Sequence, residues 1–361
     1  MEIHDYLKDK EKRLERGASR IKDFRVFDFN YIPEKPLMRQ ELKRVIDGLL
    51  RYQKTGIANH LLIFGSRGSG KTLSVRYLQE VFRRRGLPVL YANCRTHNTS
   101  FKILAHLLGA RPRGTSLAEL WHRFTTGRPG PAVLVLDEID LLSEKDGSKD
   151  ILYLASRSAE NYMAVLLSNS PKFLSSLDES TRSTLQPEVV HFRNYTAPEI
   201  EEILTERSRL GLVRTPGPLL GKIAALTTRN TNSDVRVAIK TLYYAALEPG
   251  IPVEGHFERA RRDVLLDVIG DLNDKNLLIL KAAISDPERY VKSVYERYRQ
   301  LSLAEKEEPF SYVYFYSNLS YLQSLGLILL VSTKVRRAYT NRIQLIFSPE
   351  VFDGIWRERF E

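Results

Sequence analysis

A glycine-rich run between a strand-like and a helix-like segment is the feature that most limits how this chain can fold. Residues 65–72 read Gly-Ser-Arg-Gly-Ser-Gly-Lys-Thr and match the pattern G-x-x-x-x-G-K-[ST]. The apolar run Leu61–Phe64 precedes them, and Thr72–Arg85 follows with apolar residues at helical spacing. Glycines let successive backbone N–H groups and the start of the next helix face one anion. The run predicts a phosphate-binding loop in an α/β fold; the alternative is a glycine-rich turn that binds nothing.

The residue types in this loop predict separate roles for its members. The ammonium group of Lys71 is expected to reach the β- and γ-phosphates of a nucleotide, and the hydroxyl group of Thr72 to ligate Mg²⁺. Backbone N–H groups of the loop and of the first helical turn would hold the other phosphate oxygens. The expected nucleotide contacts are Gly65, Ser66, Arg67, Gly68, Ser69, Gly70, Lys71, Thr72 and Leu73.

Short apolar runs alternate with helical patterns through residues 61–195. This alternation predicts a mostly parallel sheet with crossover helices. The expected strands are Leu61–Phe64, Pro88–Ala92, Ala132–Leu136, Ala164–Ser168 and Val189–Phe192.

After Tyr195 the pattern becomes helical up to about Ile269. Thr196-Ala197-Pro198 and Ser233-Asp234 are the expected helix starts in this part. Further helices and two β-rich runs are then expected at Asp271–Ser285, Pro287–Leu303, Ser311 to about Leu325, Leu327–Ser332 and Arg342–Phe347.

Polar side chains follow two of the expected strands. Val133–Leu136 ends in Asp137-Glu138-Ile139-Asp140, and Asn169 follows another strand. Because the carboxyl ends of parallel strands meet beside the phosphate loop, Asp137 is expected to hold Mg²⁺, and Glu138 to orient or deprotonate an attacking water. Asn169 would touch the γ-phosphate or that water, unless it is only a turn residue. Asp140 is interpreted mainly as a solvated strand end.

Arg236 lies in the first turn of the helix expected after Ser233-Asp234. A helix dipole slightly disfavours a cation at this end, so an arginine there favours an anionic partner such as the γ-phosphate. The alternative is a solvated surface arginine.

The charge of the chain is concentrated in one segment. Residues 52–130 carry 13 basic and 2 acidic side chains, a surplus that equals the formal net charge of +11 for the whole chain. Such a surplus favours a polyanionic partner, either nucleotide phosphate or nucleic acid. Cys94 is the only cysteine, and neither a signal core nor a long apolar run is present. We therefore expect a cytoplasmic protein in a reducing compartment that does not contact a membrane.

Taken in order, the phosphate loop, the Asp-Glu pair, Asn169 and Arg236 resemble an AAA+ ATPase. Tyr31-Ile32-Pro33, Met38–Glu41 and Asn93-Cys94-Arg95 make the chain similar to archaeal replication initiators. These are the proteins related to origin recognition complex subunit one and cell division control protein six. The resemblance implies a basic segment at 1–20, an AAA+ nucleotide-binding domain at 21–195, a helical lid at 196–269 and a winged-helix DNA-binding domain at 270–361.

The resemblance also implies a function. ATP or ADP with Mg²⁺ would bind between the sheet domain and the lid, with Tyr31, Ile32 and Pro33 on the adenine side. ATP would act as a conformational switch with slow hydrolysis, and the chain would bind double-stranded origin DNA at the nucleoid. Paralogous initiator subunits and a replicative helicase are the implied partners.

One segment departs from the family pattern. Relatives usually carry arginine within the stretch that corresponds to Leu177–Leu185, where it can act on a neighbour's nucleotide. Here the usual positions hold Ser180 and Thr184, and Arg182 stands where lysine is common. An arginine finger raises phosphoryl transfer rates by about 10³–10⁵. Inter-subunit hydrolysis is therefore in doubt, and Arg182 is the remaining candidate.

The C-terminal part is expected to contact DNA. Tyr312, Phe315, Leu319 and Leu322 share one helix face, which predicts the core side, and other tyrosines including Tyr316 would face outward. The following hairpin lacks acidic residues, and Val335–Thr340 is its expected tip. Solvated charge and a protein-binding helix are the alternatives. The candidate DNA contacts are Ser311, Tyr312, Tyr314, Ser317, Lys334, Arg336, Arg337, Tyr339 and Arg342.

A second DNA surface is implied after the second strand, over Arg95–Ser100 and a helix to about Arg113. Its candidate contacts are Lys102, Arg111 and Arg113.

Three functions fit these observations. The first is a replication-initiator ATPase, favoured by the presence of Glu138. The second is a nucleotide-locked DNA-binding module that essentially does not hydrolyse ATP, favoured by the missing finger arginines. The third is another AAA+ machine, such as a clamp loader or a signalling ATPase.

Overall fold

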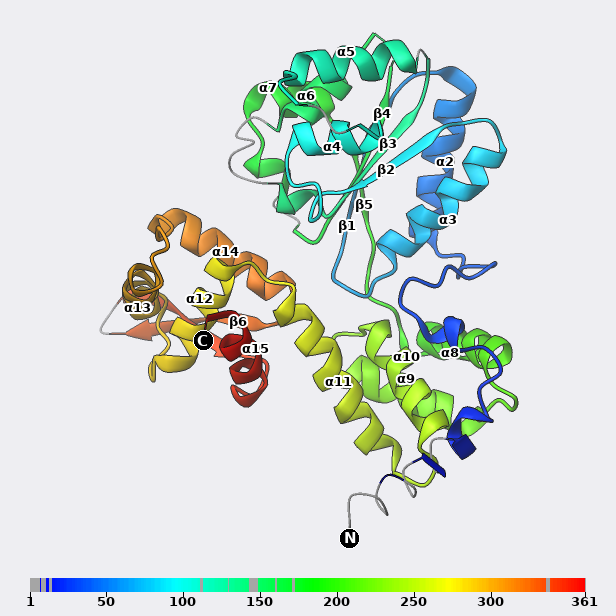
Figure 1. The fold of residues 1–361 in the computed structure, drawn as a ribbon, viewed down its shortest axis with the longest axis vertical. Coiled ribbons are helices and arrows are strands. Elements are labelled where there is room, and N and C mark those ends of the chain that lie inside the picture. Colours follow the sequence, from blue (N-terminus) through cyan, green and yellow to red (C-terminus); the bar gives the residue numbers. More distant parts are fainter. Residues whose placement is uncertain are drawn as a thin grey trace. The chain divides into compact units, whose positions relative to one another are not determined.

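The computed structural model describes residues 7, 11–12, 15–110, 113–128, 130–142, 149–159, 161–170, 173–335 and 338–360. They form two units (Figure 1). One unit comprises Asp28–Asn194, and the other joins the described residues up to Phe27 to those from Tyr195 onward. Within the described ranges, no helix combines the length and the apolar character that a membrane span needs.

The unit Asp28–Asn194 is built on a parallel five-stranded sheet in the order β2-β3-β4-β1-β5, which confirms the predicted sheet. The strands are β1 (Leu61–Phe64), β2 (Val89–Asn93), β3 (Val133–Asp137), β4 (Met163–Ser168) and β5 (Glu188–His191). Every residue of β3 and β4 is buried, because helices cover both faces of a parallel sheet.

Two layers of helices enclose the sheet (Figure 1). The helices are α2 (Gln40–Thr55), α3 (Lys71–Arg84), α4 (Ser100–Leu107), α5 (Leu117–Gly127), α6 (Asp150–Ser156) and α7 (Glu179–Leu185). Alternate strand residues enter separate cores. Ile63 and Val135 share a core with residues of α2 and α3, whereas Leu134 and Leu166 share one with residues of α4 to α7. This two-sided burial explains why the strands are continuous apolar runs.

The strand register brings the polar strand ends together. Phe64 pairs with Ser168, and Asn93 pairs with Asp137. The carboxyl ends of β1, β3 and β4 therefore lie at one edge of the sheet. The loop after β1, Asp137 and Asn169 all leave the sheet at this edge.

The second unit contains a helical lid. Its helices are α8 (Ala197–Gly211), α9 (Gly217–Asn230), α10 (Val235–Leu247) and α11 (Val253–Gly270). The carboxylate of Glu199 accepts the backbone N–H of Thr196 at 2.8 Å, which completes a capping box at the start of α8. At α10 the cap is Asp234, whose carboxylate accepts the backbone N–H of Arg236 at 3.0 Å.

The segment before residue 28 packs with the lid helices rather than with the sheet, although 21–195 was expected as one domain. Ile21 forms a β-bridge with Leu212. A Cβ atom at Gly211 would lie 2.7 Å from the ring of Phe27, so glycine permits this close approach. Contacts distant in sequence therefore hold this segment to α8, and the expected domain bounds stay a prediction.

The C-terminal part is a winged-helix domain, as the fold prediction stated. Its elements are α12 (Asp274–Ser285), α13 (Val291–Ala304), α14 (Tyr312–Ser324), β6 (Ile328–Val335), β7 (Ala338–Leu345) and α15 (Glu350–Phe360). The helix expected from Pro287 begins only at Val291, because Arg289 has φ +57° and donates its N–H to the carboxylate of Asp286 at 2.6 Å. Helix α13 therefore begins only after the turn that this hydrogen bond closes.

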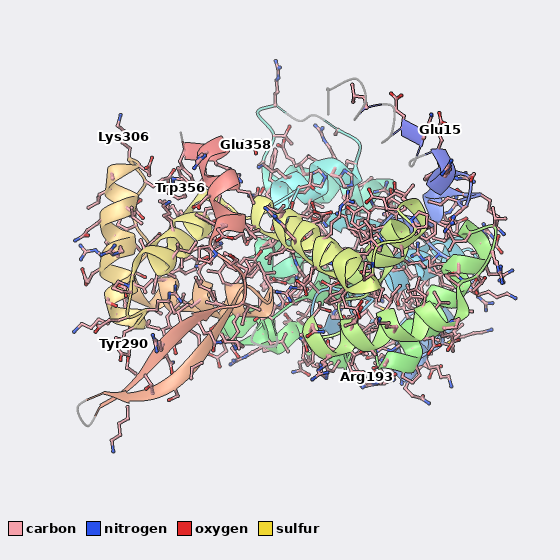
Figure 2. The ribbon with its side chains drawn as sticks, turned by 90° about the horizontal axis from the view of Figure 1, so that it is seen from below. Glu15, Arg193, Tyr290, Lys306, Trp356 and Glu358 are labelled. Carbon is pink, nitrogen blue, oxygen red and sulfur yellow. The ribbon has the colours of Figure 1, made fainter. Side chains whose placement is uncertain are left out.

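Two features of this domain differ from the sequence-based expectation. Val335 pairs with Ala338, so β6 and β7 are longer than predicted, and only residues 336–337 connect them. Figure 2 shows the two strands extending away from the helices of this domain, with Tyr290 beside their base. Helix α15 was not predicted at all. Phe352 and Trp356 pack from it into the core of the domain, four residues apart on one helical face.

Candidate nucleotide site and DNA interface

The loop after β1 has the backbone geometry of an anion cradle. A Cβ atom at Gly65 would lie 2.3 Å from the carbonyl oxygen of Phe192, so only glycine fits where the loop leaves the sheet. Gly70 has φ +88° and immediately precedes α3. Because Gly70 has no side chain to cap the helix, no capping side chain competes with an anion for the first N–H groups of α3.

Lys71 is a buried cation at the centre of this site. Its side chain is 7% exposed, and its Nζ atom donates to the carbonyl oxygens of Gly65 and Ser66 at 2.7 and 2.9 Å and to Oδ1 of Asn169 at 3.0 Å. Burial lowers the pKa of Lys71 to about 8, although the carboxylate of Asp137 opposes this shift. A bound anion would compensate the cost of burying this charge.

Asp137 is buried beside Lys71 at the end of β3. Its Oδ2 atom accepts hydrogen bonds from the hydroxyl groups of Thr72 at 2.9 Å and Tyr91 at 2.7 Å. Its Oδ1 atom accepts the backbone N–H of Glu138 at 2.9 Å. Burial raises the pKa of Asp137, and the two hydroxyl groups oppose that shift. The structure thus brings together the two residues that were predicted to hold Mg²⁺.

Glu138 follows in a left-handed conformation with φ +52°. Its Oε2 atom accepts Nε–H of Arg95 at 2.9 Å, and its Oε1 atom lies 3.9 Å from a guanidinium nitrogen of Arg67. The backbone N–H of Arg95 is itself bonded to Oδ1 of Asn93 at 2.8 Å. The predicted catalytic carboxylate is therefore paired with an arginine from the segment after β2.

Asp140 is not the solvated strand end that the sequence suggested. Its Oδ1 atom accepts the backbone N–H of Asn169 at 3.0 Å. This bond and the contact with Lys71 fix Asn169 on both its main chain and its side chain. Asn169 is 8% exposed and points into the site instead of serving as a surface turn residue.

Helix α14 presents fewer tyrosines to solvent than the sequence suggested. Phe315 and Leu319 are fully buried, whereas Tyr312 is 45% exposed and stacks edge-on against Tyr295, so its expected place in the core stripe was wrong. Tyr316, expected outside, is partly buried and accepts a hydrogen bond from Asn341. The two differences have separate causes: Tyr312 is the first residue of the helix and lies at the margin of the core, and the hairpin covers the flank that carries Tyr316.

The N-terminal end of α14 is exposed to solvent. Ser311 caps the helix by accepting the backbone N–H of Tyr314 at 3.4 Å. Tyr314 is 38% exposed and Val313 is 77% exposed, and Ser317 is also exposed. This end therefore offers a mixed polar and apolar surface.

The candidate DNA contacts of the hairpin differ in where the structure places them. Arg342 lies in β7, and its Nε–H donates to the carbonyl oxygen of Glu288 at 2.9 Å. Lys334 pairs across the hairpin with Tyr339, which places both in strands instead of the expected tip. Arg336 and Arg337 lie outside the described residues, as does the side chain of Tyr339.

The segment after β2 contains a shorter helix than expected. Helix α4 ends at Leu107, and Gly109 has φ +62°, so the helix does not reach Arg113. Lys102 is exposed and donates to Oδ1 of Asn98 at 2.9 Å, and Arg113 is exposed. Arg111 lies outside the described residues.

Comparison with known proteins identifies the family. A model described as an AAA domain matches residues 55–177. An ORC1-type DNA replication protein 1 from Sulfurisphaera tokodaii is 30% identical over 285 residues, which cover 71% of each chain. The chain belongs to the ORC1-type DNA replication proteins. A second member, from Cenarchaeum symbiosum, is 29% identical over 326 residues, 80% of this chain and 78% of that one.

Solved structures agree with this assignment. The Aeropyrum pernix ORC1 protein in complex with DNA matches with a TM-score of 0.69 and 25% identity, covering 95% of this chain and 98% of that chain. CDC6P from Pyrobaculum aerophilum has the same fold, with a TM-score of 0.58 and 22% identity over 95% of this chain and 100% of that chain. The resemblance to archaeal initiators of the AAA+ class is thus confirmed.

Other predicted residues of this ORC1-type protein stay predictions. Arg236 lies in the first turn of α10, where its guanidinium group forms an ion pair with Asp234 instead of facing solvent. Arg182 is exposed on α7. Tyr31, Ile32 and Pro33 lie in irregular backbone ahead of α2, and Ile32 is 42% exposed.

Sequence reasoning missed one buried arginine of this ORC1-type protein. Arg39 is 6% exposed and donates to the carbonyl oxygens of Ser69 and Arg193 and to Oε1 of Glu41. It ties the phosphate loop to the chain that follows β5. The resemblance already pointed to the segment 38–41, but its pattern does not show which backbone groups an arginine will reach.

Proposed function

We propose that this ORC1-type protein binds duplex DNA of replication origins under the control of ATP and hydrolyses ATP slowly. The supporting observation is the convergence of Lys71, Thr72, Asp137, Glu138 and Asn169 on one sheet edge, in a chain that also carries a winged-helix domain. Paralogous initiator subunits and a replicative helicase are the partners we propose with it. Family membership argues against the third interpretation, another AAA+ machine.

The residues at this edge fit a magnesium nucleotide. The Thr72 hydroxyl and the Asp137 carboxylate, 2.9 Å apart, are oxygen donors of the kind Mg²⁺ prefers, directly or through water. Lys71 and the N–H groups at the start of α3 would hold the phosphates of ATP or ADP. When bound, Mg²⁺ would neutralise charge that develops on the transferring phosphate.

One contact of Glu138 supports the proposal that hydrolysis is slow. Glu138 must accept a proton from water or orient it, but its carboxylate is paired with Arg95. Such a pair occupies an oxygen of the carboxylate and holds the side chain away from other partners. We propose that this pairing keeps basal turnover low.

Replacing Arg95 with Ala is expected to raise basal ATP hydrolysis by about tenfold, which corresponds to the lower end of the roughly 1.5–3 kcal/mol that a charge-assisted hydrogen bond contributes. Single-turnover phosphate release measures the effect. The exposed Arg123→Ala on α5 is a matched control and should behave as wild type. The double variant with Glu138→Gln should show no rise. An unchanged rate of phosphate release from Arg95→Ala would contradict the proposal that the Glu138–Arg95 pair keeps basal turnover low.

DNA binding is tested by footprinting on origin duplex with and without ATP. Protection that depends on ATP supports the proposal. A chain that binds ATP but leaves the duplex unprotected at moderate salt would overturn the DNA half of the proposal.

The wing residue Arg337 gives a quantitative test. Its replacement by Ala is expected to weaken duplex binding and to lower the slope of log affinity against log salt concentration by about one, as for one lost phosphate contact. Arg209→Ala, an exposed lid position, serves as the control. An unchanged slope in Arg337→Ala would count against the wing as a DNA contact.

A nucleotide-locked module is the second candidate function. The pairing of Glu138 with Arg95 and the presence of Arg182 as the only arginine in residues 177–185 both favour it. It requires that ATP stays bound and intact while DNA binds. Absence of turnover in wild type, with DNA and paralogues present, would support it.

A further inference from the structure

The metal-site carboxylate has a third side-chain neighbour that the phosphate-loop motif does not include. Tyr91 lies on β2, the strand next to β3, and its hydroxyl group donates to Oδ2 of Asp137 at 2.7 Å. This is shorter than the 2.9 Å bond from Thr72 to the same oxygen. Tyr91 therefore contacts the atom that also receives the hydroxyl of the expected metal ligand.

The hydrogen bonds of Asp137 leave little rotational freedom. Oδ2 receives the hydroxyl groups of Thr72 and Tyr91, while Oδ1 receives the backbone N–H of Glu138. A carboxylate oxygen has two lone-pair sites, so Oδ2 is saturated and Oδ1 keeps one site. That site is the one left for a cation or for a water bound to it.

The phenol ring is held in its own place. The guanidinium carbon of Arg76, on α3, lies 4.3 Å from the centre of the Tyr91 ring. The phenol donates this hydrogen bond, because an ionised carboxylate oxygen can only accept one. The ring thus bridges α3 and the end of β3.

We infer that Tyr91 is a positioning residue for the magnesium carboxylate, acting through Asp137 and not on the nucleotide itself. The inference rests on the proposed function, because it assumes that Asp137 and Thr72 hold Mg²⁺. Without the phenol, Oδ2 keeps only the Thr72 hydroxyl, and the carboxylate is free to rotate away from the orientation that leaves Oδ1 open. Groups that orient metal-binding residues in this way affect metal affinity without touching the metal.

The test is a magnesium titration of nucleotide binding by the full chain with Tyr91→Phe. A fluorescent ATP analogue reports binding, first in EDTA and then across Mg²⁺ concentrations. The half-saturating Mg²⁺ concentration is expected to rise about tenfold, the lower end of the effect of removing such partners, while affinity in EDTA stays at the wild-type value. Phenylalanine keeps the ring and its contact with Arg76.

Tyr52→Phe is the matched control. Tyr52 is a buried tyrosine of the same unit whose hydroxyl donates to the carbonyl oxygens of Ala132 and Asn161, which precede β3 and β4 at the sheet edge opposite to the loop. Its loss should lower the thermal midpoint without moving the magnesium curve. A magnesium curve for Tyr91→Phe that matches wild type, or an equal loss of affinity in EDTA, would overturn the inference. If wild-type binding is independent of Mg²⁺, the proposed metal site fails, and the inference fails with it.

Discussion

Replacing Lys71 with Ala is expected to lower the affinity for ATP by about 100-fold or more. The lysine supplies charge-assisted hydrogen bonds to phosphate, each contributing about 1.5–3 kcal/mol, and 1.4 kcal/mol corresponds to a tenfold change in affinity. Its Nζ atom now donates to the carbonyl oxygens of Gly65 and Ser66, which shows that it reaches the inside of the loop. Isothermal calorimetry with ATP and Mg²⁺ measures the loss.

The loss of ATP affinity in Lys71→Ala should not result from unfolding of the variant. Burial lowers the pKa of Lys71 to about 8, so the folded chain loses free energy by keeping this cation buried without an anion, and its removal should leave the fold intact. Lys222→Ala, an exposed lysine on α9 paired with Glu254 at 2.7 Å, is the matched control and should bind ATP like wild type. Wild-type affinity in Lys71→Ala would refute the role of the loop.

Replacing Glu138 with Gln is expected to reduce ATP hydrolysis by about 10²–10⁴-fold, the usual contribution of a general base. Nucleotide affinity should stay close to wild type, because Glu138 contacts Arg95 and Arg67 and no loop backbone group is bonded to its side chain in the described structure. Glutamine keeps the size of the side chain but cannot accept the proton. Phosphate release under single-turnover conditions gives the rate.

Glu80→Gln provides the comparison for this variant. Glu80 is a partly exposed residue of α3 that pairs with Arg83 and Arg84, so its neutralisation should leave turnover unchanged. Equal turnover in Glu138→Gln and wild type would exclude Glu138 as the base. It would also remove the main argument for an initiator that hydrolyses its nucleotide.

The parts of the site that follow one another closely in sequence were predictable. Gly65 to Thr72 form one local turn between a strand and a helix, and Asp137 and Glu138 end one apolar strand. Strand alternation then placed Asn169 at the same edge, and the contact with Lys71 agrees with this. The order of the strands in the sheet was not predicted, because apolar runs do not indicate their neighbours.

The parts that depend on long-range contacts were not predictable. Tyr91 reads as an ordinary strand residue until the pairing of β2 with β3 brings its hydroxyl to Asp137. Arg39 was noted only as part of the segment 38–41, and the fold alone shows that it contacts the carbonyl oxygens of Ser69 and Arg193. Tyr312 has helical spacing with the core residues, but the spacing alone does not show where the core ends.

The amino-acid pattern by itself determined the class of fold and the phosphate loop, because each is a local arrangement set by glycine geometry, caps and the period of apolar residues, whereas the winged-helix tail was implied by the family resemblance. Tertiary structure alone decided which groups hold the carboxylates. Arg95 reaches Glu138 across 43 residues and Tyr91 reaches Asp137 across 46. The reason is physical, since the energy of a buried charge depends on all groups packed around it, and packing joins residues that no local pattern relates.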